Sequence, residues 1–193
     1  MRFTFGPPPS ALSFDDIATG DWHRLRQPPF WAIYLLTLLV GAAIASAILV
    51  AWAVMTPDVD IDFGDAAWVI VVGWSTLLLG TLAQIAAYPG GFRDAILGIW
   101  ASRITVYTGY AGELSRARHL LELSLPFLLL SMGPLLFVTV TRLQSGWLIY
   151  VSGLAAFVFS FNAVLALSAA WQMPAHARVR CVRLQPYWRV PPA

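Results

Sequence analysis

The chain contains no lysine, a single cysteine and little charge of either sign. Charged residues make up 11% of its 193 residues, whereas soluble domains carry about 25%. All twelve basic residues are arginine, and they flank apolar segments instead of forming the basic stripe of a nucleic-acid-binding surface. The composition therefore argues against an ordinary soluble domain and against a nucleic-acid partner. The 59% hydrophobic content favours a membrane protein.

Because Cys181 is the only cysteine, an internal disulfide and a paired-thiol metal motif are both excluded. Arg178, Arg180 and Arg183 surround it in the sequence, and nearby positive charge lowers the pKa of a thiol. An unreactive thiol near the membrane surface is the more ordinary interpretation. The chain also lacks a G-x-S-x-G elbow and a phosphate-binding Walker loop. No cofactor is predicted.

Four apolar segments are each long enough to cross a bilayer, which takes about 20 residues. They run over 30–55, 66–88, 119–140 and 147–173. This pattern predicts an all-α membrane protein with four transmembrane helices and membrane lipid as a constant partner. An amphipathic stretch or a hairpin is expected between the second and third helices, where residues 104–107 are β-branched and aromatic. The membrane domain 30–173 follows a polar leader, 1–29, and precedes a basic tail, 174–193.

Arginines are distributed unevenly among the segments that flank the apolar stretches. The leader holds three, the segment 89–118 four and the tail four, whereas 56–65 holds none and 141–146 one. Positive residues accumulate on the cytoplasmic side of membrane proteins. The distribution therefore predicts that both termini and the segment 89–118 are cytoplasmic, in a bacterial cytoplasmic membrane.

Four aspartates lie in the short segment between the first two apolar stretches: Asp58, Asp60, Asp62 and Asp65. A calcium-binding EF loop needs glycine at its sixth position and glutamate at its twelfth, and neither is in place. A solvated acidic loop is the ordinary interpretation of such a run. A weak divalent-cation site is the alternative.

A series of short motifs follows the second apolar segment. In order, they are Tyr88-Pro89-Gly90-Gly91, Gly112-Glu113-Leu114-Ser115-Arg116, Leu125-Pro126-Phe127, Ala177-Arg178-Val179-Arg180 and Tyr187-Trp188. Their order and spacing, over about 115 residues, resemble those of a bacterial and archaeal family of zincin-type membrane peptidases. The resemblance implies an H-E-x-x-H metal-binding helix at the end of the second span and an acidic third ligand in the fourth.

The residues at those metal positions depart from the family pattern. Counted back from Pro89, Gly80, Thr81 and Gln84 stand where the resemblance implies His, Glu and His. Asn162 stands near the place of the acidic ligand. Zinc is bound by imidazole, thiolate or carboxylate, and the glutamate of the motif is the general base. These residues therefore predict a degenerate site that has lost its metal.

The remaining polar candidates for function lie around the start of the third span. His119 and Glu122 are spaced three apart, as in some di-metal bundles, and Glu113 and Arg116 precede them. The ordinary interpretation pairs Glu122 with Arg118 one turn away and places His119 at the membrane surface. A pair of metal ligands is the alternative.

Gln84 and Asn162 are the polar residues deepest in the apolar segments. A hydrogen bond between their amides across two helices is the expected structural role. The alternative is a polar remnant that binds substrate, because intramembrane polar groups are often functional.

Three functions remain open. The first is a non-catalytic pseudo-peptidase that binds or scaffolds other membrane proteins, or a second copy of itself, through small-residue faces such as residues 41–46. The second is an accessory subunit of a larger membrane complex that packs against pigment or lipid. The third is an active membrane metallopeptidase with an unrecognised site. We expect one of the first two, because a site without ligands cannot hold zinc.

Overall fold

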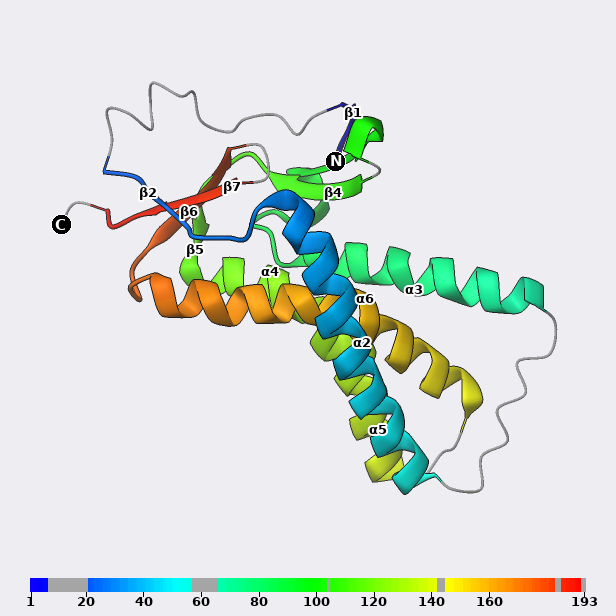
Figure 1. The fold of residues 1–193 in the computed structure, drawn as a ribbon. Coiled ribbons are helices and arrows are strands. Elements are labelled where there is room, and N and C mark those ends of the chain that lie inside the picture. The colour runs from blue at the N-terminus through cyan, green and yellow to red at the C-terminus, as the bar shows by residue number, and fades with distance from the viewer. Residues whose placement is uncertain (7–20, 57–65, 104, 142–144, 183–184, 192–193) are drawn as a thin grey trace. The chain divides into compact units, whose positions relative to one another are not determined.

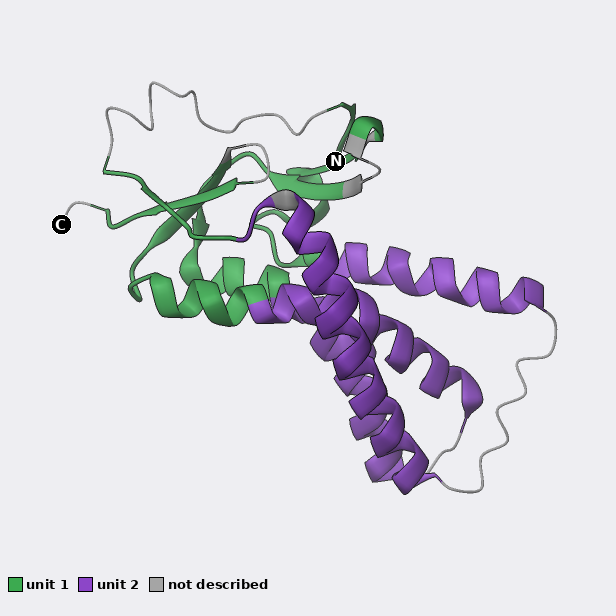
Figure 2. Cartoon of the chain, viewed as in Figure 1, with its two compact units in different colours: residues 1–27, 84–123, 165–193 green, residues 28–83, 124–164 purple. Residues whose placement is uncertain are grey.

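The computed structural model describes residues 1–6, 21–56, 66–103, 105–141, 145–182 and 185–191. The four aspartates at 58–65 lie outside these residues, so the choice between a solvated loop and a cation site stays open. The chain forms two compact units (Figure 2). Unit 1 comprises residues 1–27, 84–123 and 165–193, and unit 2 comprises residues 28–83 and 124–164.

Four helical segments are long and apolar enough to cross a membrane, and they indicate an integral membrane protein. The first two are α2 (Phe30–Met55) and α3 (Ala66–Ala86). The third consists of α4 (Arg116–Phe127), the π-helical turn η3 (Leu128–Met132) and α5 (Gly133–Thr141). The fourth is α6 (Gly146–Gln172) (Figure 1). Four helices thus occupy the four apolar stretches of the sequence.

The third segment changes helix type between two prolines. Pro126 lies in α4 and Pro134 in α5, with η3 between them. Proline has no N–H, so each leaves a carbonyl one turn earlier without its usual donor. The π turn shifts the bonding pattern at this point. The carbonyl of Ser131 in η3 accepts a hydrogen bond from the Oγ of Ser152 in α6, at 2.8 Å.

Glycines allow the helices of unit 2 to approach closely. Gly41 of α2 lies against the backbone carbonyl of Phe157 in α6, and Gly80 of α3 lies against the ring of Phe159. A Cβ atom at either glycine would overlap these neighbours, so small residues at these points permit the packing. The buried apolar cluster of this unit contains Ala45, Ile48, Trp52, Val138, Ile149 and Ala156.

Unit 1 contains two small sheets. In the first, β1 (Arg2–Phe5) pairs in parallel with β3 (Ala95–Trp100), which forms an antiparallel hairpin with β4 (Thr105–Tyr110). In the second, the order is β2 (His23–Arg24), β7 (Gln185–Arg189), β6 (Arg178–Val182) and β5 (Leu114–Ser115), all antiparallel (Figure 1). The short 3-10 turns η1 (Gly91–Arg93) and η2 (Ala101–Arg103) flank β3.

The all-α expectation is therefore incomplete: the chain is mostly helical, and it also contains these sheets. The hairpin expected between the second and third helices is present as β3 and β4. The leader and the tail were not expected to form strands, yet β2 of the leader pairs with β7 of the tail. A buried cluster includes members from both sheets and the adjoining helix ends: Leu25, Ile85, Tyr88, Ala95, Leu114, Ala169, Met173, Ala177 and Val179.

Candidate functional site

A chain of polar side chains runs through unit 1 to Glu122. Tyr88 donates its hydroxyl proton to Oε1 of Glu122 at 2.6 Å, and Thr108 donates to Oε1 of Gln84 at 3.1 Å. The Tyr88 and Thr108 oxygens are 3.3 Å apart. This contact is weaker, because each hydroxyl has one proton and already donates it elsewhere. Nδ1 of His119 lies 3.4 Å from Oε2 of Glu122. We call these five residues the Glu122 cluster.

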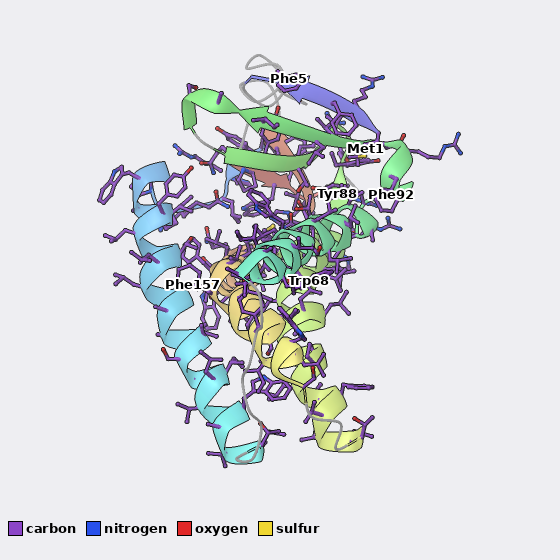
Figure 3. All side chains as sticks on the ribbon, turned by 90° about the vertical axis from the view of Figure 1, so that its right-hand side faces the viewer. Met1, Phe5, Trp68, Tyr88, Phe92 and Phe157 are labelled. Atoms are coloured by element: carbon purple, nitrogen blue, oxygen red, sulfur yellow. The ribbon has the colours of Figure 1, made fainter. Side chains whose placement is uncertain are left out.

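Three elements bring the cluster together. Gln84 lies in the last turn of α3, and Tyr88 lies in the turn that follows it. Thr108 lies in β4, and both His119 and Glu122 lie in α4. The chain leaves the turn after α3 through Gly90 and Gly91, whose φ angles of 77° and 55° are accessible chiefly to glycine. The buried ring of Tyr88, labelled in Figure 3, stacks on Tyr110 of β4 with 5.6 Å between ring centroids.

Burial and the Glu122 charge control the protonation of two neighbouring groups. Burial first, and the carboxylate of Glu122 second, raise the pKa of Tyr88 well above its usual value, so its hydroxyl remains a donor. The same two causes raise the pKa of the Cys181 thiol on β6 to about 12. The thiol is therefore protonated at neutral pH. The direction of this shift favours the unreactive thiol over an arginine-activated cysteine.

His119 is buried without a hydrogen bond. It is 3% exposed, and neither ring nitrogen has a hydrogen-bond partner among the described residues. The 3.4 Å contact with Glu122 meets the distance of an ion pair but lacks hydrogen-bond alignment. The expected Glu122–Arg118 pair is wrong, because the carboxylate faces Tyr88 and His119 and Arg118 is exposed. The expected depth of His119, at the membrane surface, stays a prediction.

The His119–Glu122 pair supplies two side chains that can bind a metal ion. Zinc sites in proteins use at least three protein ligands. Within the described ranges, no three His, Cys, Asp or Glu side chains gather at one place. As a ligand set, the pair is therefore too small for a zinc site.

Packing and hydrogen bonds occupy the positions at which the resemblance implies metal ligands. Gly80 lies against the Phe159 ring. Thr81 Oγ1 donates to the backbone carbonyl one turn earlier at 2.9 Å, and Gln84 accepts a hydrogen bond within the Glu122 cluster. Asn162 is half-buried in α6 and belongs to unit 2, whereas Gln84 belongs to unit 1. The hydrogen bond expected between these two amides stays a prediction.

Glu113 and Arg116 connect distant parts of unit 1. Oε1 of Glu113 lies 2.8 Å from Arg189 and 3.2 Å from Arg180. Both guanidinium groups lie over the ring of Trp22, at 4.7 and 5.9 Å from its centroid. Arg116 Nη2 donates at 2.8 Å to a carbonyl in the last turn of α6, where helix carbonyls lack intrahelical donors. Both residues therefore hold the leader, the tail and the helix ends in place.

Tyr88 and Thr108 were not predicted as site residues. The sequence signal for Tyr88 is its place between an apolar span and a Pro-Gly-Gly turn. Thr108 carries no signal beyond its position in a β-strand. Their hydrogen bonds join residues 20, 24 and 34 positions apart in the chain, which residue spacing alone does not reveal.

No protein-family model matches the chain, and no curated protein or solved structure matches it. The likeness to zincin-type membrane peptidases therefore remains a resemblance in motif order.

Proposed function

We propose that this protein is a non-catalytic integral membrane protein, a pseudo-peptidase relative that binds or scaffolds other membrane proteins. The contact between Gly80 and Phe159 carries this proposal. A side chain at position 80 would have to displace the Phe159 ring, which is buried in unit 2. The place where the resemblance implies the first zinc ligand is therefore used for helix packing.

The other implied metal positions support the same proposal. A threonine at position 81 has no carboxylate to act as a base, and its hydroxyl already donates to the carbonyl one turn earlier. Gln84 carries a neutral amide that accepts a hydrogen bond from Thr108. None of these groups is a zinc ligand of ordinary strength, so the helix that would hold the metal serves structural contacts.

The surface of α3 supports a binding role. Trp74 lies near the middle of this helix and is 69% exposed, with exposed Val71 and Leu78 about one turn away on either side. Tryptophan in membrane proteins concentrates at the two water interfaces and is also enriched in protein–protein interfaces. An exposed tryptophan at mid-span therefore favours contact with a partner helix over contact with lipid tails alone.

The loss of the metal is tested by elemental analysis of the purified full-length protein together with a peptidase assay on unfolded membrane substrates. We expect no stoichiometric zinc and no cleavage. Stoichiometric zinc that is removed by a chelator, with loss of cleavage, would favour the active metallopeptidase instead.

The binding role is tested by photo-crosslinking in native membranes, with a benzoylphenylalanine residue in place of Trp74. The matched control carries the same residue at Leu39, which is exposed in α2. We expect a discrete protein adduct from position 74 and none from position 39. An adduct with the same chain identifies a homo-oligomer, and an adduct with a subunit of a larger assembly identifies an accessory subunit. Lipid adducts alone at both positions contradict the proposal.

A further inference from the structure

A pocket of about 270 Å³ opens in unit 1. Its walls come from the start of β1, the turn after α3, β3 and the segment after β4. Arg2, Arg93 and Asp94 supply its charged groups, and Tyr110 and Ala111 also line it. Pockets for drug-sized molecules occupy about 300–1,000 Å³, so this volume suits a small ligand or the head of a larger one.

Two arginines and one aspartate set the charge of the pocket. Among the residues that the structure describes, no carboxylate lies within 4.0 Å of Arg2 or Arg93. The carboxylate of Asp94 lies against the backbone of Gly90. Two guanidinium groups and one carboxylate leave the pocket with an excess of positive charge. Guanidinium groups bind phosphate by paired, charge-assisted hydrogen bonds.

Backbone and aromatic contacts hold the walls of the pocket. The amino group of Met1 donates to the carbonyl of Arg93 at 3.0 Å, which joins the start of β1 to η1. Tyr110 packs over the backbone of Gly112, so that a Cβ atom there would meet the ring at 2.6 Å. Tyr110 also stacks on Tyr88 and packs against the buried cluster of unit 1. Arg2 in β1 and Arg93 in η1 therefore belong to elements that are joined by a hydrogen bond.

Only a few residues of the chain separate the pocket from the third membrane segment. The third membrane segment, Arg116–Thr141, has 26 residues and is about 39 Å long at 1.5 Å per residue, compared with about 30 Å for the hydrocarbon core. Its first turn carries Arg116 and Arg118, so the extra length reaches the headgroup region at this end. Gly112 precedes Arg116 by four residues and therefore lies within about 14 Å of the helix start.

Exposed phenylalanines neighbour both arginines in the sequence. Phe3 and Phe5 on β1 are 71% and 87% exposed, and Phe92 is 48% exposed. Met1 and Phe92, both labelled in Figure 3, lie near one another, and the amino group of Met1 donates to the carbonyl of Arg93 at 3.0 Å. Surfaces that lie on a bilayer combine apolar or aromatic side chains with arginine or lysine. Phe3 and Phe5 lie on the face of β1 opposite Arg2, and Phe92 is next to Arg93 in the chain. Exposed aromatic and arginine side chains of unit 1 therefore combine as at a membrane interface.

We propose that this pocket binds the phosphate of an anionic phospholipid headgroup, with Arg2 and Arg93 as the residues that contact the phosphate. The proposal is independent of the pseudo-peptidase function, because it uses none of the Glu122 cluster and none of the implied metal positions.

The test titrates the purified, delipidated full-length protein in an uncharged detergent and follows binding by calorimetry. The probes are dihexanoyl phosphatidylglycerol, dihexanoyl phosphatidylcholine and inorganic phosphate. We expect saturable one-to-one binding of phosphatidylglycerol only. Each basic residue near an anionic surface contributes about a fivefold gain in affinity, so the Arg2→Gln/Arg93→Gln variant should bind roughly 30-fold more weakly.

Two matched variants separate a pocket from diffuse charge. Arg118→Gln removes the same charge from an exposed arginine close to the membrane but outside the pocket, and it should leave the affinity unchanged. Ala111→Leu keeps both arginines and fills the pocket from an exposed position, and it should abolish saturable binding. Circular dichroism and thermal unfolding confirm that each variant is folded.

Three results would overturn the proposal. Equal weakening by Arg118→Gln would show a diffuse electrostatic effect. Unchanged affinity in Ala111→Leu would place the ligand elsewhere. Inorganic phosphate that binds as tightly as phosphatidylglycerol, with the same response to the arginine variants, would assign the pocket to a free anion instead of a lipid.

Discussion

The hydrogen bond between Tyr88 and Glu122 is the shortest contact of the Glu122 cluster, and it can be tested by deletion. Tyr88→Phe removes the donor to a largely buried carboxylate, and hydrogen bonds to charged groups contribute about 1.5–3 kcal/mol. We expect a loss of unfolding free energy of that size, measured by denaturation in detergent. Tyr187→Phe is the control, because the Tyr187 hydroxyl has no hydrogen bond to any described residue.

A double-mutant cycle with Glu122→Gln shows whether the two residues act as a pair. The two losses should be non-additive by at least about 0.5 kcal/mol, because residues in direct contact are coupled. Strictly additive losses would mean that Tyr88 acts through its ring packing alone.

Cys181 offers a second test at the scale of one residue. Its pKa rises from 9.0 to about 12 in the folded protein, which lowers the thiolate fraction at pH 8 by about three orders of magnitude. Alkylation by iodoacetamide should therefore be slow in the folded protein, accelerate as the pH rises toward 12, and be fast at pH 8 in denaturant. Because the chain has no other cysteine, the measured alkylation rate belongs to Cys181 alone.

The sign of the stability effect follows from the same shift. The folded protein holds this proton more tightly than the unfolded chain does, so the contribution of Cys181 to stability is complete below pH 9 and is lost between pH 9 and about 12. Cys181→Ala should flatten the stability profile in that window. Equal alkylation rates in the folded and denatured protein would contradict a thiol pKa that is raised by folding.

At the scale of elements, α6 contains two fully buried serines in different situations. Ser152 donates to the Ser131 carbonyl of η3 at 2.8 Å, whereas Ser160 Oγ has no partner among the described residues. Ser152→Ala should cost about 0.6–1.7 kcal/mol, the range for polar contacts between membrane helices. Ser160→Ala should be neutral or stabilising, because it removes an unpaired buried hydroxyl.

The serine pair is compared by thermal unfolding of both variants in the same detergent. The difference between them isolates the link between α6 and η3, since both changes remove one hydroxyl from the same helix. A larger loss of thermal stability from Ser160→Ala than from Ser152→Ala would contradict a stabilising hydrogen bond between α6 and η3.

At the scale of the whole molecule, the arginine distribution predicts which ends of the helices face the cytoplasm. In a Cys181→Ser background, Ala66→Cys at the start of α3 and His176→Cys after α6 introduce single exposed thiols. An impermeant maleimide added to intact cells should label position 66 and spare position 176 until the membrane is permeabilised. Labelling of position 176 and protection of position 66 would indicate the opposite topology.

The helices could be predicted from the sequence, because apolar length alone specifies a span. The hairpin could be predicted too, because its residues are β-branched and aromatic. The second sheet was missed for a physical reason: β2 and β5 are two residues long, too short for a periodic signal. In β6, buried Val179 alternates with arginines, and those arginines were interpreted as indicators of topology, as neighbours of Cys181 and as part of a motif, but not as strand residues.

The candidate site was predictable in part. The spacing of His119 and Glu122 identified the pair, since three residues separate neighbours on a helix face. Its partners come from a turn and a strand, so only the folded chain reveals them. The same limit applies to Gly80, because its contact with Phe159 depends on how two helices pack.

The pairing of β2 with β7 has a consequence for biosynthesis. His23 of β2 pairs with Trp188 of β7. The ribosome must therefore add about 165 more residues after His23 before β2 can pair with β7. At roughly 5–20 residues per second, that delay is about 8–33 s. Throughout it, four hydrophobic helices are being inserted while the early strand edge stays open to chaperones and proteases. A stop codon that removes only the last ten residues should therefore leave every helix intact and still mark the protein for degradation.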